Sequence, residues 1–181
     1  HSNPPTAIRA LGRKTKHKVN TYDKTYKHYH LRTSKIKSKG DALSSRRMLF
    51  SNEDVCIYKS HINQNMKTLF KNAYADELLF VSSGKGILET NFGNLNIKYG
   101  DYIVIPRGVI WKIDIESKMK ILVIEASGPI ETPERYRNKF GQLLEHSPFS
   151  ERDIITPNFQ KAIQKSSPKI KIKFKDVVQS Y

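Results

Sequence analysis

The chain has 181 residues and a formal net charge of +15 at pH 7, which is enough sequence for one barrel-sized domain with some additional elements. No apolar run approaches the roughly 18–20 residues needed to cross a membrane, and no signal-peptide pattern precedes the first polar stretch. The chain begins at His1 rather than Met, so we expect a processed chain or a piece of a longer protein. Its single cysteine, Cys56, cannot form an intrachain disulfide, which favours a reducing, cytoplasmic setting.

The excess positive charge lies at the two ends of the chain. Residues 1–50 hold thirteen basic and two acidic residues and residues 160–181 hold six and one, whereas residues 51–159 hold thirteen and fourteen. Tyrosines interleave with basic residues near the start, which could stack bases over a phosphate track; they are Tyr22, Tyr26 and Tyr29 with Lys24, Lys27 and Arg32. No nucleic-acid-binding motif accompanies them, so the interpretation we favour is a solvated basic surface or one that meets an acidic partner subunit.

Strand signals begin after an irregular, basic segment at residues 1–47. From residue 48 to residue 125, short apolar or alternating runs are separated by turn signals every 8–12 residues, as in an antiparallel sandwich or barrel. The expected strands lie near residues 55–58, 78–81, 87–88, 95–99, 102–105, 111–115 and 121–124. The sequence Asn91-Phe92-Gly93-Asn94 predicts a hairpin turn, because Gly and Asn tolerate positive φ angles.

The sequence changes character after residue 128. Thr132 is a candidate N-cap, Pro133 suits a first helical position and Gly141 suits a C-terminal stop, so a short helix is predicted at 133–140. Ile170, Ile172 and Phe174 alternate with lysines and predict one more half-buried strand, whose partner could lie beyond residue 181. These patterns divide the chain into segments 1–47, 48–127 and 128–181.

The most specific string runs from Gly100 to Trp111 (GDYIVIPRGVIW). It resembles the second cupin motif, in which Gly, five residues, Pro, one residue, Gly and two residues lead to a metal-binding His. Gly100 allows a sharp turn, the apolar run crosses a barrel wall, and Pro106 with Gly108 bends the chain back. The next inward side chain is Trp111, whose indole has no lone pair to offer a cation and would fill the cavity instead.

The first cupin motif is also incomplete. It needs two His one residue apart and then a Glu, followed after six residues by a Gly; Glu77 and Gly84 fit only this second half. The two His positions fall on residues that are not the ligands required, either Phe70 and Asn72 or Lys71 and Ala73. A divalent metal needs three or four donors converging at about 2 Å. We therefore expect no metal, cofactor-binding or catalytic residue in the barrel.

Two further histidine-containing pairs are candidate sites. His28 and His30 have the spacing of two ligands on one strand face, but no Glu follows at the required distance, so a polar strand surface is favoured. Glu145 and His146 precede a Ser-Pro turn, where a hydrogen-bonded structural corner is favoured over an acid–base couple. The chain contains no nucleophile elbow, phosphate loop or Cys-His pair.

Three stretches taken together resemble the homogentisate 1,2-dioxygenases. They are residues 76–86 (DELLFVSSGKG), 100–108 (GDYIVIPRG) and 140–154 (FGQLLEHSPFSERDI), with weaker support from residues 1–6, 31–33 and 40–41. The resemblance implies an all-β, cupin-type jelly-roll barrel forming the N-terminal half of a bicupin. It thins after residue 157, the family's chain is much longer, and the basic ends are unlike a typical member.

The resemblance also implies a function for the whole protein. The family opens the ring of homogentisate with O₂ to give maleylacetoacetate in tyrosine and phenylalanine catabolism, using Fe(II) held by two His and one Glu. Those ligands belong to a C-terminal barrel outside residues 1–181, and no position here matches them. The expected partners are a small aromatic acid, O₂ and further copies of the chain, with neither nucleic acid nor membrane. The rival interpretation is a stand-alone degenerate cupin that binds a small molecule or a polyanion without catalysis.

Overall fold

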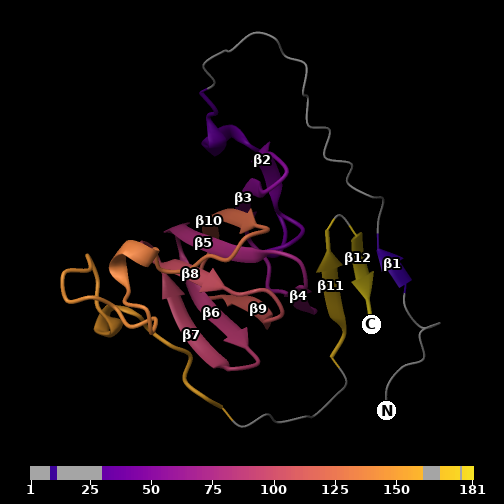
Figure 1. The fold of residues 1–181 in the computed structure, drawn as a ribbon. Helices are drawn as coiled ribbons and strands as arrows, with labels where there is room; N and C mark the ends of the chain where they lie inside the picture. Colours follow the sequence, from indigo (N-terminus) through magenta and orange to yellow (C-terminus); the bar gives the residue numbers. More distant parts are fainter. Residues whose placement is uncertain (1–8, 12–29, 161–167, 176) are drawn as a thin grey trace.

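The computed structural model describes residues 9–11, 30–160, 168–175 and 177–181 (Figure 1). Within these ranges all of the regular secondary structure is strand, apart from three short 3-10 turns. The elements in chain order are β1 (Arg9–Leu11), η2 (Thr33–Lys35), β2 (Arg47–Ser51), β3 (Val55–Ile62), β4 (Leu69–Asn72), β5 (Asp76–Ser83), β6 (Lys85–Thr90), β7 (Gly93–Lys98), β8 (Tyr102–Ile105), β9 (Ile110–Ile115), β10 (Met119–Ala126), η3 (Glu134–Tyr136), η4 (Glu151–Asp153), β11 (Ile170–Phe174) and β12 (Val177–Ser180).

The strands form two sheets that share one core. This arrangement is a cupin-type jelly roll. One sheet has the order β1-β12-β11-β4-β9-β6-β7 and the other has the order β2-β3-β10-β5-β8. Both sheets contribute inward side chains to a single buried cluster, among them Leu79, Val81, Ile121 and Val123 from the second sheet and Phe70, Leu88, Trp111 and Ile113 from the first. The alternation of buried and half-buried residues along β10 shows the period of two expected of a strand with one face in the core.

The local turn predictions are confirmed. β6 and β7 pair in register as a hairpin closed at residues 91–92, and Gly93 adopts φ +124°. Gly100 turns the chain into β8 with φ +92°. Because these turns need backbone conformations that L side chains rarely adopt, glycine fixes their places in the sequence.

The predicted helix at 133–140 is wrong. Only the 3-10 turn η3 forms there; Pro133 is extended at ψ 143° and Arg137 at ψ 151°. The backbone hydrogen bonds that would continue a helix go elsewhere: Leu144 N–H donates to the carbonyl of Tyr136, and Asn138 N–H donates to that of Gln142. The segment therefore folds back on itself as a compact loop, visible in orange in Figure 1.

The strand predicted at residues 170–174 is confirmed as β11, but its partners lie within the chain. β11 pairs in parallel with β4, starting from Ile170 opposite Leu69, and in antiparallel with β12. Figure 1 shows β11 and β12 completing the sheet beside β4. No helix in the described ranges is long and apolar enough to cross a membrane.

Candidate functional site

The four positions singled out by the cupin motifs converge inside the barrel. β4 turns Phe70 and Asn72 inward, with 2% and 3% of each residue exposed. The two His positions of the first cupin motif therefore correspond to Phe70 and Asn72. Lys71 and Ala73 are not the inward pair, because Lys71 lies on the opposite face of β4. Glu77 on β5 and Trp111 on β9 are fully buried, and the Trp111 ring packs edge-on against Phe70 at 5.4 Å between centroids. Trp111 thus fills the barrel interior, as its place in the motif predicts.

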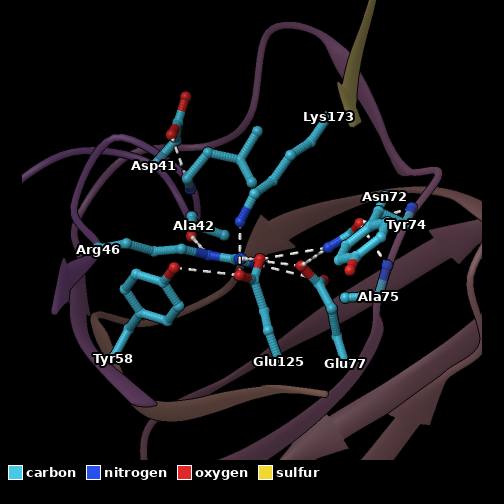
Figure 2. Close-up of polar contacts among 11 residues, drawn as sticks. Asp41, Ala42, Arg46, Tyr58, Asn72, Tyr74, Ala75, Glu77, Glu125 and Lys173 are labelled. Atoms are coloured by element: carbon cyan, nitrogen blue, oxygen red, sulfur yellow. Dashed lines mark hydrogen bonds and ion pairs between the residues drawn. The ribbon is translucent and has the colours of Figure 1, made fainter. Parts of the chain in front are cut away.

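Arg46 directs its guanidinium into this group; Figure 2 shows it pointing towards Glu77, Glu125 and Asn72. Its Nη1 donates to Glu77 Oε1 at 2.8 Å and its Nη2 to Glu77 Oε2 at 3.3 Å, a bidentate ion pair. The guanidinium carbon also lies 5.8 Å from the Phe70 ring centroid and 5.9 Å from that of Trp111. A protein cation therefore occupies the place toward which the motif positions of a metal cupin point.

A short turn before β2 presents Arg46 to the barrel. The side chain of Asp41 accepts hydrogen bonds from the N–H groups of Leu43 and Ser44, which fixes the turn. Arg46 Nε then donates to the carbonyl of Ala42 at 3.2 Å, which orients the side chain towards the barrel interior. The aspartate at position 41 thus positions Arg46 through the backbone rather than by direct contact.

Glu125 on β10 is the second carboxylate of the network. It accepts hydrogen bonds from Arg46 Nη1 at 3.1 Å and from the Tyr58 hydroxyl at 3.1 Å, and it forms an ion pair with Lys173 of β11. Asn72 Nδ2 donates to both Glu77 and Glu125 at 3.2 Å. The network contains two carboxylates, one guanidinium and one ammonium, so its formal charges cancel.

The electrostatics hold Glu125 and Arg46 in their charged forms. Burial raises the pKa of Glu125, but the positive charges of Arg46 and Lys173 outweigh it and leave that pKa below its ordinary value. Burial works against the charge of Arg46 as well, yet Glu77 and Glu125 raise its pKa further above the ordinary value. Burial and the charge of Glu125 raise the pKa of Tyr58, which therefore stays a neutral hydrogen-bond donor.

The donor set in the barrel does not fit ferrous iron. A facial site needs two imidazoles and a carboxylate with free lone pairs, whereas both Glu77 oxygens accept from Arg46, position 72 carries an amide and position 111 an indole. The Trp111 indole N–H is buried and has no hydrogen-bond partner among the described residues. In the same ranges, no group of three or more His, Cys, Asp or Glu side chains is placed to hold a metal ion.

A hollow of about 300 Å³ lies beside the network at one end of the barrel. Glu125 and Lys173 of the network line it, together with Cys56, Tyr74 and Lys175. Lys175 lies over the Tyr74 ring at 5.6 Å. This hollow is where a small molecule could reach the charged network from solvent.

The other candidate pairs are not brought together into a site. Glu145 and His146 are both exposed, and the turn there is closed by the Ser147 N–H donating to the carbonyl of Leu144. His30 is exposed, while His28 and the interleaved tyrosines at 22, 26 and 29 lie outside the described residues.

Sequence reasoning missed three members of the network. Arg46, Glu125 and Lys173 are brought to the motif positions by strand pairings between distant parts of the chain. A signal was present only for Glu125, which continues the period-two inward series of Ile121 and Val123.

These observations define the class: a cupin barrel in which an internal salt-bridge network takes up the positions of the metal-binding side chains. The chain belongs to the homogentisate 1,2-dioxygenase N-terminal family, whose model matches residues 8–136. It is also similar to a putative dioxygenase of Saccharolobus solfataricus, with 34% identity over 175 residues. That alignment covers 96% of this chain and 45% of the relative, so the chain spans less than half the length of that protein.

Solved cupin structures resemble about half of the chain. A cupin-2 domain protein of Shewanella frigidimarina matches with a TM-score of 0.42 and 24% identity, over 45% of this chain and 79% of that one. A cupin protein of Bacteroides fragilis matches with a TM-score of 0.43 and 18% identity, over 52% and 86%. A salicylate 1,2-dioxygenase of Pseudoaminobacter salicylatoxidans matches with a TM-score of 0.42 and 13% identity, over 46% of this chain and 25% of that one. The fold assignment itself rests on the strand order of the two sheets and on the family.

Proposed function

We propose that this chain is the N-terminal, non-catalytic barrel of an iron-dependent dioxygenase that cleaves the ring of homogentisate. In the whole protein, homogentisate and O₂ would combine to give maleylacetoacetate, with both oxygen atoms retained in the product, as a step of tyrosine and phenylalanine catabolism. Membership of the family and the similarity to a putative dioxygenase support this proposal. The observation that carries the non-catalytic role is the bidentate pairing of Arg46 with Glu77, the one carboxylate at a motif position.

The ferrous ion would be held outside residues 1–181, by two His and one Glu of a second barrel. When bound there it would supply open coordination positions for O₂ and substrate. The barrel described here would support the second barrel and contribute to contacts in a cytoplasmic homo-oligomer. The core connects the two sheets, and the Arg46 network links them again, through Glu77 and Glu125 of one sheet and Lys173 of the other.

The test compares the whole gene product with the 181-residue chain. Each is supplied with ferrous iron and homogentisate, and both oxygen uptake and formation of maleylacetoacetate are recorded. We expect turnover by the whole protein and none by the 181-residue chain. Turnover by the 181-residue chain would contradict the non-catalytic role, and failure of the iron-loaded whole protein to use homogentisate would contradict the assigned substrate.

A variant of the whole protein tests the role of the motif carboxylate directly. Glu77→Gln should leave the iron content per folded protein unchanged, because Glu77 is paired with Arg46 rather than with a metal. Loss of iron from folded Glu77→Gln protein, measured by atomic emission after dialysis, would make Glu77 a ligand and refute the proposal.

The hollow beside Glu125 favours one alternative, a stand-alone degenerate cupin that binds a small molecule or a polyanion. A stop codon directly after residue 181 in the gene would favour this alternative. The polyanion version predicts DNA affinity that falls steeply with salt, which a titration between low and physiological ionic strength measures.

A further inference from the structure

Four basic side chains share the outer face of the five-stranded sheet on three neighbouring strands. We call them the outer basic block: Arg47 on β2, Lys59 and His61 on β3, and Lys120 on β10. Arg47 lies directly opposite Lys59 and His61 directly opposite Lys120. Tyr58, which alternates with them on β3, points into the barrel and bonds Glu125, so the block faces outward.

Two cross-strand pairs of basic residues lie side by side in this block, and in one of them, Arg47 with Lys59, both side chains are positively charged. Like charges directly opposite each other on a sheet are destabilising. In the described part of the chain no salt bridge involves any member of the outer basic block. By contrast, Lys112 on β9 in the other sheet is paired with both Glu89 and Asp114. The outer basic block therefore lacks the compensation that the fold provides elsewhere.

Lys59 is the most costly member of the block. It is only 9% exposed, and its ammonium donates to the hydroxyl of Ser82 at 2.9 Å. An ammonium withdrawn from water normally needs an anionic partner. Burial and the nearby Lys120 lower the pKa of Lys59, so its surroundings disfavour the charge.

His61 points to the same conclusion. Its Nε2 is buried without a hydrogen-bond partner among the described residues. Burial lowers its pKa, and Lys59 on its own strand and Lys120 opposite lower it further. The segment packed against its backbone contributes Ser38, whose Oγ accepts from the His61 N–H, and exposed lysines at positions 37 and 39. The charged groups facing His61 from these elements are positive.

We propose that the outer basic block, together with Ser82, binds an oxyanion, either a phosphoryl group or a carboxylate. An anion seated between the two cross-strand pairs would offset the repulsion between Arg47 and Lys59 and would favour protonation of His61. It would accept hydrogen bonds from the Lys59 and Lys120 ammonium groups and from protonated His61. The site lies on the outside of the barrel, so it does not depend on the ring-cleavage proposal.

The test uses the whole 181-residue chain with inorganic phosphate as the probe. The imidazole C–H resonances of the histidines are followed by NMR against pH, in phosphate and in chloride at equal ionic strength, with His61 assigned by a His61→Gln variant. A bound anion favours the protonated imidazole. We expect the titration midpoint of His61 to move upward in phosphate while that of exposed His146 stays in place.

Variants connect the shift to the block. Lys59→Met keeps the buried aliphatic stem and Lys120→Gln alters an exposed side chain, so both should fold; each should weaken phosphate binding by roughly tenfold or more, because a charge-assisted hydrogen bond is lost. Lys98→Gln, an exposed lysine on β7, is the matched control and should bind as the parent does.

Acetate distinguishes the two sources of the oxyanion. A response to phosphate alone supports a phosphoryl ligand, and an equal response to acetate supports a carboxylate presented by a partner surface. Equal midpoints of His61 in chloride and in phosphate would overturn the proposal. So would an equal shift at His146, or phosphate affinity unchanged by both Lys59→Met and Lys120→Gln.

Discussion

Replacing Arg46 by Met should be among the most damaging single changes in the chain. Methionine keeps an unbranched apolar stem, but it removes the guanidinium over Phe70 and Trp111. It also leaves Glu77 and Glu125, which are 0% and 5% exposed, without the cation that both share. Removing one partner of a buried ion pair costs about 3–5 kcal/mol, because the other charge stays buried and uncompensated. We expect a loss of this size in the free energy of unfolding at pH 7.

Urea unfolding followed by tryptophan fluorescence measures this loss at the right place. Trp111 is the only tryptophan of the chain, and it lies against the network. Adding Glu77→Gln to Arg46→Met should recover part of the loss, since the double variant removes a buried charge. The loss should also shrink as the pH falls below 4.5, the ordinary pKa of a Glu such as Glu125, because protonation then removes the uncompensated charge.

The exposed pair of Arg137 with Glu131 provides the control for this experiment. It is bidentate, at 2.8 and 3.1 Å, but it lies at the surface. Arg137→Met should therefore change stability far less than Arg46→Met. The electrostatic account would be refuted if the free energy of unfolding of Arg46→Met lay within about 1 kcal/mol of that of the parent. A double variant less stable than Arg46→Met alone would refute it as well.

Three further predictions test the barrel. Trp111→His should destabilise the protein by about 3 kcal/mol or more, because packing around the indole is lost. The variant should retain no iron after dialysis, because Arg46 still donates to both Glu77 oxygens. Stoichiometric iron in the dialysed variant would contradict this. Glu125→Gln should flatten the acid side of the stability profile: the lowered pKa of Glu125 contributes stability that is present above about 4.5 and lost as the pH falls through the folded-state value, so an unchanged profile in pH-dependent urea titrations would contradict the assignment. Gly84→Ala should lower the free energy of unfolding more than Gly108→Ala, which should lower it by about 1–2 kcal/mol. Both glycines adopt φ +88°, but a Cβ at 84 would lie 2.3 Å from the Lys118 carbonyl oxygen, whereas one at 108 meets open space. Equal midpoints of thermal unfolding for the two variants would show that this close approach does not matter.

The sequence predicts those parts of the fold whose causes are local. The hairpin at Gly93, the turn at Gly100 and the inward placement of Trp111 follow from turn residues and from alternation along a strand. Pro133 and Gly141 are residues that often begin and end a helix. The backbone between them instead forms hydrogen bonds with Gln142 and Leu144. Local signals therefore predict a helix at 133–140 where only a 3-10 turn forms.

The interior network depends on contacts that no local pattern reveals. Arg46 meets Glu125 across 79 positions of sequence, and Lys173 meets Glu125 across 48. In the sequence, Arg46 is one basic residue among many near the start, and Lys173 is one of several alternating lysines near the end. Pairing of β2 with β3 and of β11 with β4 is what selects these two from their neighbours.

The parallel pairing of β11 with β4 has a consequence for synthesis of the chain on the ribosome. Until residues 170–173 have emerged, β4 has an open edge with unpaired N–H and C=O groups, and Glu125 lacks the ammonium of Lys173. Open strand edges are templates for wrong pairing between nascent chains, and contacts between distant segments form slowly. The edge of β4 can be covered only after β11 and β12 have left the exit tunnel, about 100 residues after β4 itself has been made, and until then it stays open to wrong pairing.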